Sequence, residues 1–170
     1  MIRDNGPGVL LLPVKLMKTR GPLTVDNFLP LHKATVQHEA SDDAIARGKA
    51  VTVLTYLHGT KESEDAIETL KAEGYDVDLI ELTCLKPFDK ETVETSLKRT
   101  HKLAILDEST RSGGVGATMS ALVAETLFDE LDAPVLRLCM EDAPVPYATE
   151  MEKEMVKRAS DLVAGVKSMC

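Results

Sequence analysis

The chain has 170 residues, of which 44% are hydrophobic, 28% are charged and only 4% are aromatic. This length suffices for one domain with its own core, and the shortage of aromatic side chains argues against a surface on which nucleic-acid bases stack. Lysine and arginine number 20 against 28 aspartate and glutamate, which gives a net charge of −8. The chain should therefore repel phosphate backbones and attract basic partners.

Three cysteines, Cys84, Cys139 and Cys170, are scattered along the chain without C-x-x-C spacing. They predict neither a zinc site nor a disulfide framework, and a reducing compartment suits them best. The longest early apolar run, GVLLLPV, is too short to span a bilayer, and the first residues lack the features of a secretory signal. We therefore expect no nucleic-acid or membrane partner.

The first 48 residues differ in pattern from the rest. GVLLLPVKLM (8–17) is compatible with one buried strand, but the segments that follow it, KTRGPLTVDNFLP and HEASDDAIARG, are rich in residues typical of turns. A single apolar segment on a long polar arm cannot form its own core. We therefore interpret residues 1–48 as an N-terminal arm or linker and residues 49–170 as one domain.

From Lys49 onward, short apolar runs alternate with amphipathic helical patterns. The predicted strands cover residues 50–56, 75–82, 102–108 and 133–139. The apolar faces of the predicted helices consist of Ala66, Ile67 and Leu70; Val93 and Leu97; Ala117, Ala121, Ala124, Phe128 and Leu131; and, in one final helix, Met151, Met155, Ala159, Leu162 and Val166. Asp89 is the expected N-cap of the second helix. The alternation predicts an α/β fold whose mostly parallel sheet is covered on both faces.

The segment DESTRSGGVGATMSALVAETL (107–127) follows a predicted strand, at the edge where open α/β sheets usually bind ligands. A dinucleotide fingerprint needs G-x-G-x-x-G, but here Gly114 and Gly116 are followed by a methionine in place of the third glycine. Asp107 and Glu108 would also repel a phosphate. A structural turn, a contact loop for another subunit and a nucleotide site remain as interpretations.

Arg111, in the same segment, bears on the choice between these interpretations. Its planar guanidinium is suited to clamp a carboxylate at an interface or across the loop, and a solvated side chain is the alternative.

No other pattern predicts a reaction centre. The histidines lack the spacing of metal ligands, and Ser109 and Ser112 lack the context of a nucleophile elbow. Cys84 is expected to be a buried, unreactive thiol. Four acids near a helix end, where the helix dipole disfavours them, form either a solvated face or a docking patch for a basic module: Glu125, Asp129, Glu130 and Asp132.

Five segments together resemble, in order and spacing, the C-terminal domain of the β subunit of pyruvate dehydrogenase, the thiamine-diphosphate-dependent first component. They are VTVLTY, LTCLKPFDKETV, LDESTRSGGVGA, LFDELDAPVLRL and DAPVPYA. The segments LKPFD and KRTHK are most similar to those of plastid and cyanobacterial members. The resemblance covers roughly residues 25–170, and IRDNGP resembles the last strand of the pyrimidine-binding domain that precedes this one in the family.

The resemblance implies a three-layer fold of the transketolase C-terminal type with a mixed sheet, preceded by a remnant of the pyrimidine-binding domain within residues 1–48. It implies that thiamine diphosphate and Mg²⁺ belong to the parent assembly, and that this chain carries no catalytic, cofactor or metal residue. The implied partners are a pyruvate dehydrogenase α subunit, a second β subunit and the dihydrolipoamide acyltransferase. The chain would then serve oxidative decarboxylation of pyruvate to acetyl-CoA only within that assembly, in the plastid stroma or, alternatively, in a mitochondrial matrix or bacterial cytoplasm.

The same resemblance implies particular contact residues. Subunit contacts are expected at Asp107, Glu108, Arg111, Gly113, Gly114 and Gly116, and in a second loop at Asp142, Pro144, Pro146 and Tyr147. The acyltransferase is expected to dock on Asp129, on Asp132 of the LDAP motif, and on the C-terminal carboxylate of Cys170. Two other hypotheses are a non-catalytic relative recruited as a structural subunit of another complex, and a small-molecule binding module that rests only on the glycine turn.

Overall fold

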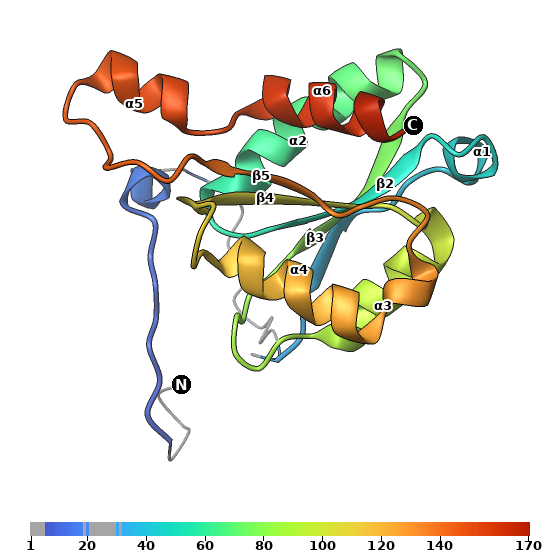
Figure 1. Ribbon diagram of the computed structural model, residues 1–170, viewed down its shortest axis with the longest axis horizontal. Helices are drawn as coiled ribbons and strands as arrows, with labels where there is room; N and C mark the ends of the chain where they lie inside the picture. Colours follow the sequence, from blue (N-terminus) through green and yellow to red (C-terminus); the bar gives the residue numbers. More distant parts are fainter. Residues whose placement is uncertain (1–5, 19, 21–29, 31) are drawn as a thin grey trace.

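A five-stranded sheet forms the centre of the computed structural model, which describes residues 6–18, 20, 30 and 32–170 (Figure 1). In spatial order the strands are β1 (Thr35–His38), β3 (Asp76–Glu81), β2 (Ala50–Thr55), β4 (Leu103–Thr110) and β5 (Leu136–Met140). β1 runs antiparallel to β3, whereas the other neighbours are parallel. The α/β class and the mixed, mostly parallel sheet are therefore confirmed.

Helices cover both faces of the sheet, which gives three layers (Figure 1). One face carries α2 (His58–Ala72) and α6 (Ala159–Met169), and the other carries α3 (Lys90–Thr100) and α4 (Val115–Thr126). The short elements are η1 (Val14–Lys18), α1 (Asp42–Ala46), η2 (Phe128–Glu130) and α5 (Thr149–Met155). Within the described ranges, no helix is long and apolar enough to cross a bilayer.

The core has one apolar cluster on each side of the sheet. Val53 and Leu79 contact α2 and α6, while Leu54 and Ile80 contact α3 and α4. Because both faces are covered, the central strands are almost continuously buried and are mainly apolar, with a few buried polar residues such as Thr52 and Asp78. This is why the strands were predictable to within a few residues.

The sheet also includes residues that precede Lys49. β1 pairs with β3, and its His38 lies 2.9 Å from the carboxylate of Asp76. The amide of Ala40, which leads into α1, donates to Asp78 Oδ1 at 2.8 Å. The division of the chain at residue 48 stays a prediction, but the part of the chain that packs on the sheet begins earlier, at β1.

The buried strand expected within residues 8–17 is wrong. Residues 8–13 form no regular element, and η1 follows them. The side chains of Val9, Leu10 and Leu12 are 85%, 67% and 61% exposed. No strand in the described part of the chain pairs with this segment, so its apolar side chains are left on the surface. The segment KTRGPLTVDNFLP lies mostly outside the described residues.

The apolar face predicted for α4 is also wrong. Ala121, Ala124 and Phe128 are exposed, and the opposite side of the helix, with Met119 and Val123, faces the sheet. The helix is apolar nearly all round, so periodicity could not decide which side would be buried. An apolar stripe is consequently left on the surface of the described chain.

The final helix is two helices instead of one. Glu62 of α2 accepts hydrogen bonds from the Arg158 guanidinium and the Ala159 amide, both at 2.9 Å. The Arg158 amide donates to Asp161 at 2.8 Å, which starts a new helix at Ala159. α6 then packs on α2, while α5 buries none of its described residues.

Candidate subunit-contact site

Asp107, near the carboxyl end of β4, holds three elements together. It is 3% exposed, and its two oxygens accept four hydrogen bonds. Oδ1 accepts from the Tyr56 hydroxyl at 2.5 Å and the Ser109 amide at 2.9 Å. Oδ2 accepts from the Ser109 hydroxyl and the Gly116 amide, both at 2.6 Å. The carboxylate thus joins the ends of β2 and β4 to the first turn of α4.

These contacts move the pKa values of both ionisable partners further from pH 7. Burial alone would raise the pKa of Asp107, but hydrogen bonds from Ser109, Tyr56 and the Gly116 amide hold that pKa below its ordinary value. Burial, aided by the hydrogen bond to Asp107, raises the pKa of Tyr56 well above its ordinary value. At neutral pH the aspartate is therefore ionised and the tyrosine protonated, which suits a structural role better than proton transfer.

This arrangement occupies the place where such a sheet usually binds a ligand. The chain passes from β2 to β3 on one side and from β4 to β5 on the other. The crevice at the switch point therefore lies between the carboxyl ends of β2 and β4. The hydrogen bond from Tyr56 to Asp107 crosses that crevice. The first turn of α4 donates to Asp107, where a phosphate would otherwise sit. This geometry argues against the nucleotide interpretation.

The glycines of this turn serve close packing. A Cβ added to Gly116 would lie 2.8 Å from Asp107 Oδ2. A Cβ added to Gly114 would lie 2.0 Å from Ser109 Oγ and 2.5 Å from the carbonyl oxygen of Thr110. Both glycines are buried, and both are needed to seat α4 against the end of β4.

The exposed tip of the turn touches the second predicted contact loop. Asp142 accepts hydrogen bonds from the Ser112 amide at 2.7 Å and the Ser112 hydroxyl at 2.6 Å. These bonds, supported by the charges of Arg111 and Arg137, lower the pKa of Asp142. The guanidinium of Arg137 donates to the carbonyl oxygen of Arg111. Two loops that are 30 residues apart in sequence thus form one surface.

The structure divides the ten residues expected at subunit contacts into two groups. Asp107, Gly114 and Gly116 are buried and form the frame of the turn. The remaining seven are exposed or half-buried: Glu108, Arg111, Gly113, Asp142, Pro144, Pro146 and Tyr147. Within the described chain, the guanidinium of Arg111 makes no hydrogen bond or ion pair of its own, so it is free to meet a partner. The contact role of these seven residues stays a prediction.

The three expected docking residues lie at the other end of the sheet. The Asp132 amide donates to the His101 carbonyl oxygen at 2.8 Å, and the Lys102 ammonium lies 3.5 Å from the Cys170 sulfur. His101 and Lys102 directly precede β4, so the LDAP motif and Cys170 lie at the same end of the sheet, on opposite faces of it (Figure 1). Asp129, Asp132 and Cys170 are all exposed. Their docking role stays a prediction.

The described residues do not fit a site for thiamine diphosphate and Mg²⁺. Nowhere in the described ranges do three His, Cys, Asp or Glu side chains gather to bind a metal ion. Asp107, the acid at the switch point, has both oxygens engaged within the chain. We therefore assign no step of a cofactor reaction to these residues, and the location of the cofactor elsewhere in the assembly stays a prediction.

The cysteines differ in burial. Cys139 is buried, but Cys84 is half-buried, which corrects the expectation of a buried thiol. Cys84 lies in a turn after β3, beside an open apolar cavity of about 640 Å³ whose outer wall is residues 7–11. All three thiols are free.

Sequence reasoning missed two polar clusters. Tyr56 was taken as the end of a strand, and its bond to Asp107 was not foreseen. Asp76 and Asp78 alternate in a strand that is otherwise apolar, and both are buried. Charged residues at buried strand positions need partners, so this alternation was a signal of a buried hydrogen-bond network.

The buried carboxylates predict loss of stability in acid. Burial alone would raise the pKa values of Asp76, Asp89 and Asp107, but hydrogen bonds to each carboxylate lower them below the ordinary value. Their contribution to stability is present above the unfolded-state pKa of about 3.9 and is lost as pH falls through the folded-state values. The urea midpoint should therefore stay level from pH 7 to about 6 and fall below about pH 5. A midpoint that rises on acidification from pH 5 to 3.5 would contradict this.

The fold is a three-layer α/β domain with a mixed five-stranded sheet, and comparison with known proteins identifies its class. The pattern of the family "Transketolase, C-terminal domain" matches residues 43–162. This chain belongs to the transketolase C-terminal domain family. A solved structure described as "Split gene transketolase, inactive beta4 tetramer" superposes with a TM-score of 0.69 and 26% identity, over 86% of this chain and 45% of that one.

The similar curated proteins are subunits of one enzyme. The chain is 36% identical over 169 residues to "Pyruvate dehydrogenase E1 component subunit beta" of Porphyra purpurea, covering 99% of this chain and 49% of that protein. It is 38% identical over 169 residues to the chloroplastic subunit beta-2 of Arabidopsis thaliana, covering 99% of this chain and 40% of that protein. The resemblance found in the sequence is thereby confirmed. The chain spans about half the length of these relatives or less.

Proposed function

We propose that this chain acts as the C-terminal, assembly-forming portion of a pyruvate dehydrogenase β subunit. The observation that carries the proposal is that 99% of the chain aligns with such subunits, while its own switch-point crevice is filled by Tyr56 and Asp107. The chain then contributes to oxidative decarboxylation of pyruvate only together with an α subunit. Thiamine diphosphate and Mg²⁺ are bound by other parts of that assembly.

Exposed apolar surface supports an assembly role. Ala121 and Ala124 of α4 and Phe128 of η2 are exposed, and Phe128 is 70% exposed. Val145 and Tyr147 of the second contact loop are also largely exposed. Large apolar side chains gathered on a surface mark contacts with other proteins. We assign this surface, with the tip around Arg111, to contacts with the α subunit and a second β subunit.

Charge supports docking of a basic partner at the opposite end. The net charge is −8, and Asp129 and Asp132 are exposed at the same end of the sheet as Cys170. Acidic surfaces steer and hold basic modules. We propose that this edge binds the basic subunit-binding domain of the dihydrolipoamide acyltransferase. The plastid stroma is the proposed compartment, because relatives in Arabidopsis thaliana and rice are named chloroplastic.

Co-expression with a plastid pyruvate dehydrogenase α subunit tests the assembly role. Light scattering should show a complex that contains both chains. The variant Ala124→Glu should reduce the yield of the complex. The matched control Ala72→Glu, at the end of α2, should not, because that residue lies on the other face of the sheet. A chain that stays monomeric beside every α subunit tested contradicts the proposal.

A second candidate is a relative that builds a structural complex without catalysis. It is favoured by the similar solved structure, which is described as an inactive tetramer. Decarboxylase activity with thiamine diphosphate and added α subunit separates the two. The main proposal requires activity once the part of a β subunit that this sequence does not span is supplied in trans, and a purely structural relative restores none.

A further inference from the structure

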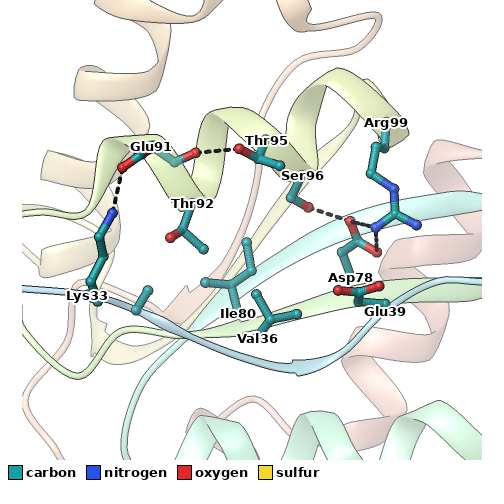
Figure 2. Close-up of a pocket in the computed structure, with 11 residues that line it drawn as sticks. Lys33, Val36, Glu39, Asp78, Ile80, Glu91, Thr92, Thr95, Ser96 and Arg99 are labelled. Carbon is teal, nitrogen blue, oxygen red and sulfur yellow. Dashed lines mark hydrogen bonds and ion pairs between the residues drawn. The ribbon is translucent and has the colours of Figure 1, made fainter. Parts of the chain in front are cut away.

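An open groove lies between β1 and α3, away from both surfaces described so far (Figure 2). Its volume is about 480 Å³. Ala34, Val36 and Ile80 form an apolar floor, and Thr92 and Thr95 of α3 line the wall above it. We call this the β1–α3 groove. Val36, whose side chain points toward the groove, is 44% exposed, whereas Ile80 beside it is fully buried, so the floor is open to a ligand at Val36.

The end of the groove near Lys33 is held by the first turn of α3. The Lys33 ammonium lies 2.5 Å from the Glu91 carboxylate, and the Ala34 amide donates to Asp89 Oδ2 at 2.8 Å. Asp89, the predicted N-cap, also accepts from the Thr92 hydroxyl at 2.6 Å. These bonds set the spacing between the chain before β1 and the start of α3.

The other end is held by a buried carboxylate. Asp78 is 1% exposed and accepts hydrogen bonds from Ser96 Oγ at 2.7 Å and from Arg99 Nη1 at 3.2 Å (Figure 2). Arg99 also donates to the Ala40 carbonyl oxygen at 3.2 Å, which fixes the chain after β1. A groove whose walls are fixed at both ends loses little conformational entropy when it is filled.

The backbone beside the groove is available for pairing. β1 is an outer strand of the sheet, and no strand of the described chain lies on its free side. Exposed edges are normally protected by lysine, proline or a bulge. β1, with the sequence TVQH, has neither lysine nor proline, and its one irregularity is a register shift between Val36 and His38. Part of its edge can therefore accept another strand.

The charges around the groove favour a basic occupant. Glu39 is exposed and has no hydrogen-bond or ion-pair partner in the described part of the chain. It lies beside Asp78 at one end, and Glu91, with a side chain that is 82% exposed, lies at the other. The two cations that line the groove, Lys33 and Arg99, are already paired with Glu91 and Asp78. The charge left without a partner is negative.

We propose that the β1–α3 groove binds an extended basic segment of another polypeptide, which adds as a strand to the free edge of β1. An apolar side chain of that segment covers Val36, and a lysine or arginine side chain next to it meets Glu39. Backbone pairing supplies affinity, and the exposed Val36 and the unpaired Glu39 supply selectivity. This site does not depend on the proposed function, because it shares no residue with the contact loops or the docking residues.

The probe is a fluorescein-labelled peptide, Lys-Val-Lys-Val-Lys-Val-Lys, added to the ¹⁵N-labelled chain and followed by fluorescence polarisation and amide shifts. Shifts are expected at residues 33–39 and 91–99. A peptide whose central valine is replaced by proline keeps every charge but lacks one amide hydrogen, and should bind at least tenfold more weakly. A peptide with glutamate in place of lysine should not bind.

Two protein variants with the same net charge complete the test. Glu39→Lys should weaken binding at least fivefold, whereas Glu68→Lys, at an exposed position on α2 across the sheet, should leave it within twofold. If both variants weaken peptide binding equally, the binding reflects general electrostatic attraction to an acidic chain, and the proposal is overturned. The proposal is also overturned by equal binding of the proline peptide, by shifts centred on residues 125–132, or by the absence of binding.

Discussion

Replacing Asp107 with alanine is expected to lower the free energy of unfolding by about 3 kcal/mol or more. The substitution leaves the Tyr56 hydroxyl, the Ser109 amide and the Gly116 amide without an acceptor at a buried site. It also removes the negative charge that faces the amino end of α4. Urea denaturation followed by circular dichroism measures the change.

Asp142 provides the matched control, because it accepts two hydrogen bonds in the adjoining loop but is exposed. Asp142→Ala should leave the urea midpoint close to that of the unmodified chain. The urea midpoint of Tyr56→Phe should fall between those of the two alanine variants, since this substitution removes one of the four donors to Asp107. If Asp107→Ala is no less stable than Asp142→Ala, the buried carboxylate does not organise the turn.

Asp132→Lys should weaken docking of a basic acyltransferase subunit-binding domain about thirtyfold, or about 2 kcal/mol. The reason is that a favourable contact between opposite charges becomes a repulsive one. Fold stability should change little, because the Asp132 side chain is exposed and its structural contact is made by the backbone amide. Isothermal titration calorimetry with the isolated subunit-binding domain gives the affinities.

Glu68→Lys serves as the control here as well, because it makes the same change in net charge at an exposed position on α2. Its effect on docking should be small and should vanish in higher salt. Equal loss of affinity in the two variants, or no loss in either, would show that Asp132 lies on a surface with no docking role.

The predictions that succeeded were those on which local pattern and burial agree. The strands beginning near Ala50 and Leu103 are buried on both faces, so their apolar runs left no other interpretation. Asp89 was recognisable as an N-cap because its bonds to Thr92 are made within one turn. The contact-loop residues were named from a family resemblance, and the structure adds that Ser112 and Asp142 join the two loops.

The failures occurred where a distant residue decides the outcome. The final helix is divided because Glu62, almost a hundred residues earlier, accepts hydrogen bonds from the residues at the break. β1 was taken as part of an arm because its four residues carry no strong alternation, yet pairing with β3 places it in the sheet. Such long-range contacts leave no periodic trace in the sequence.

What could be read from the order of amino acids was therefore the α/β class, the central strands, the acidic charge and the family to which the chain belongs. The class and the strands follow from hydrophobic burial and local backbone preference, which act over a few neighbouring residues, whereas the charge is a count of side chains and the family was identified by resemblance. Only folding in three dimensions revealed that Asp107 closes the switch-point crevice, that the apolar stripe of α4 faces solvent, and that a groove opens beside β1. Each of these depends on which surfaces meet across the sheet, and that choice is made by packing between segments far apart along the chain.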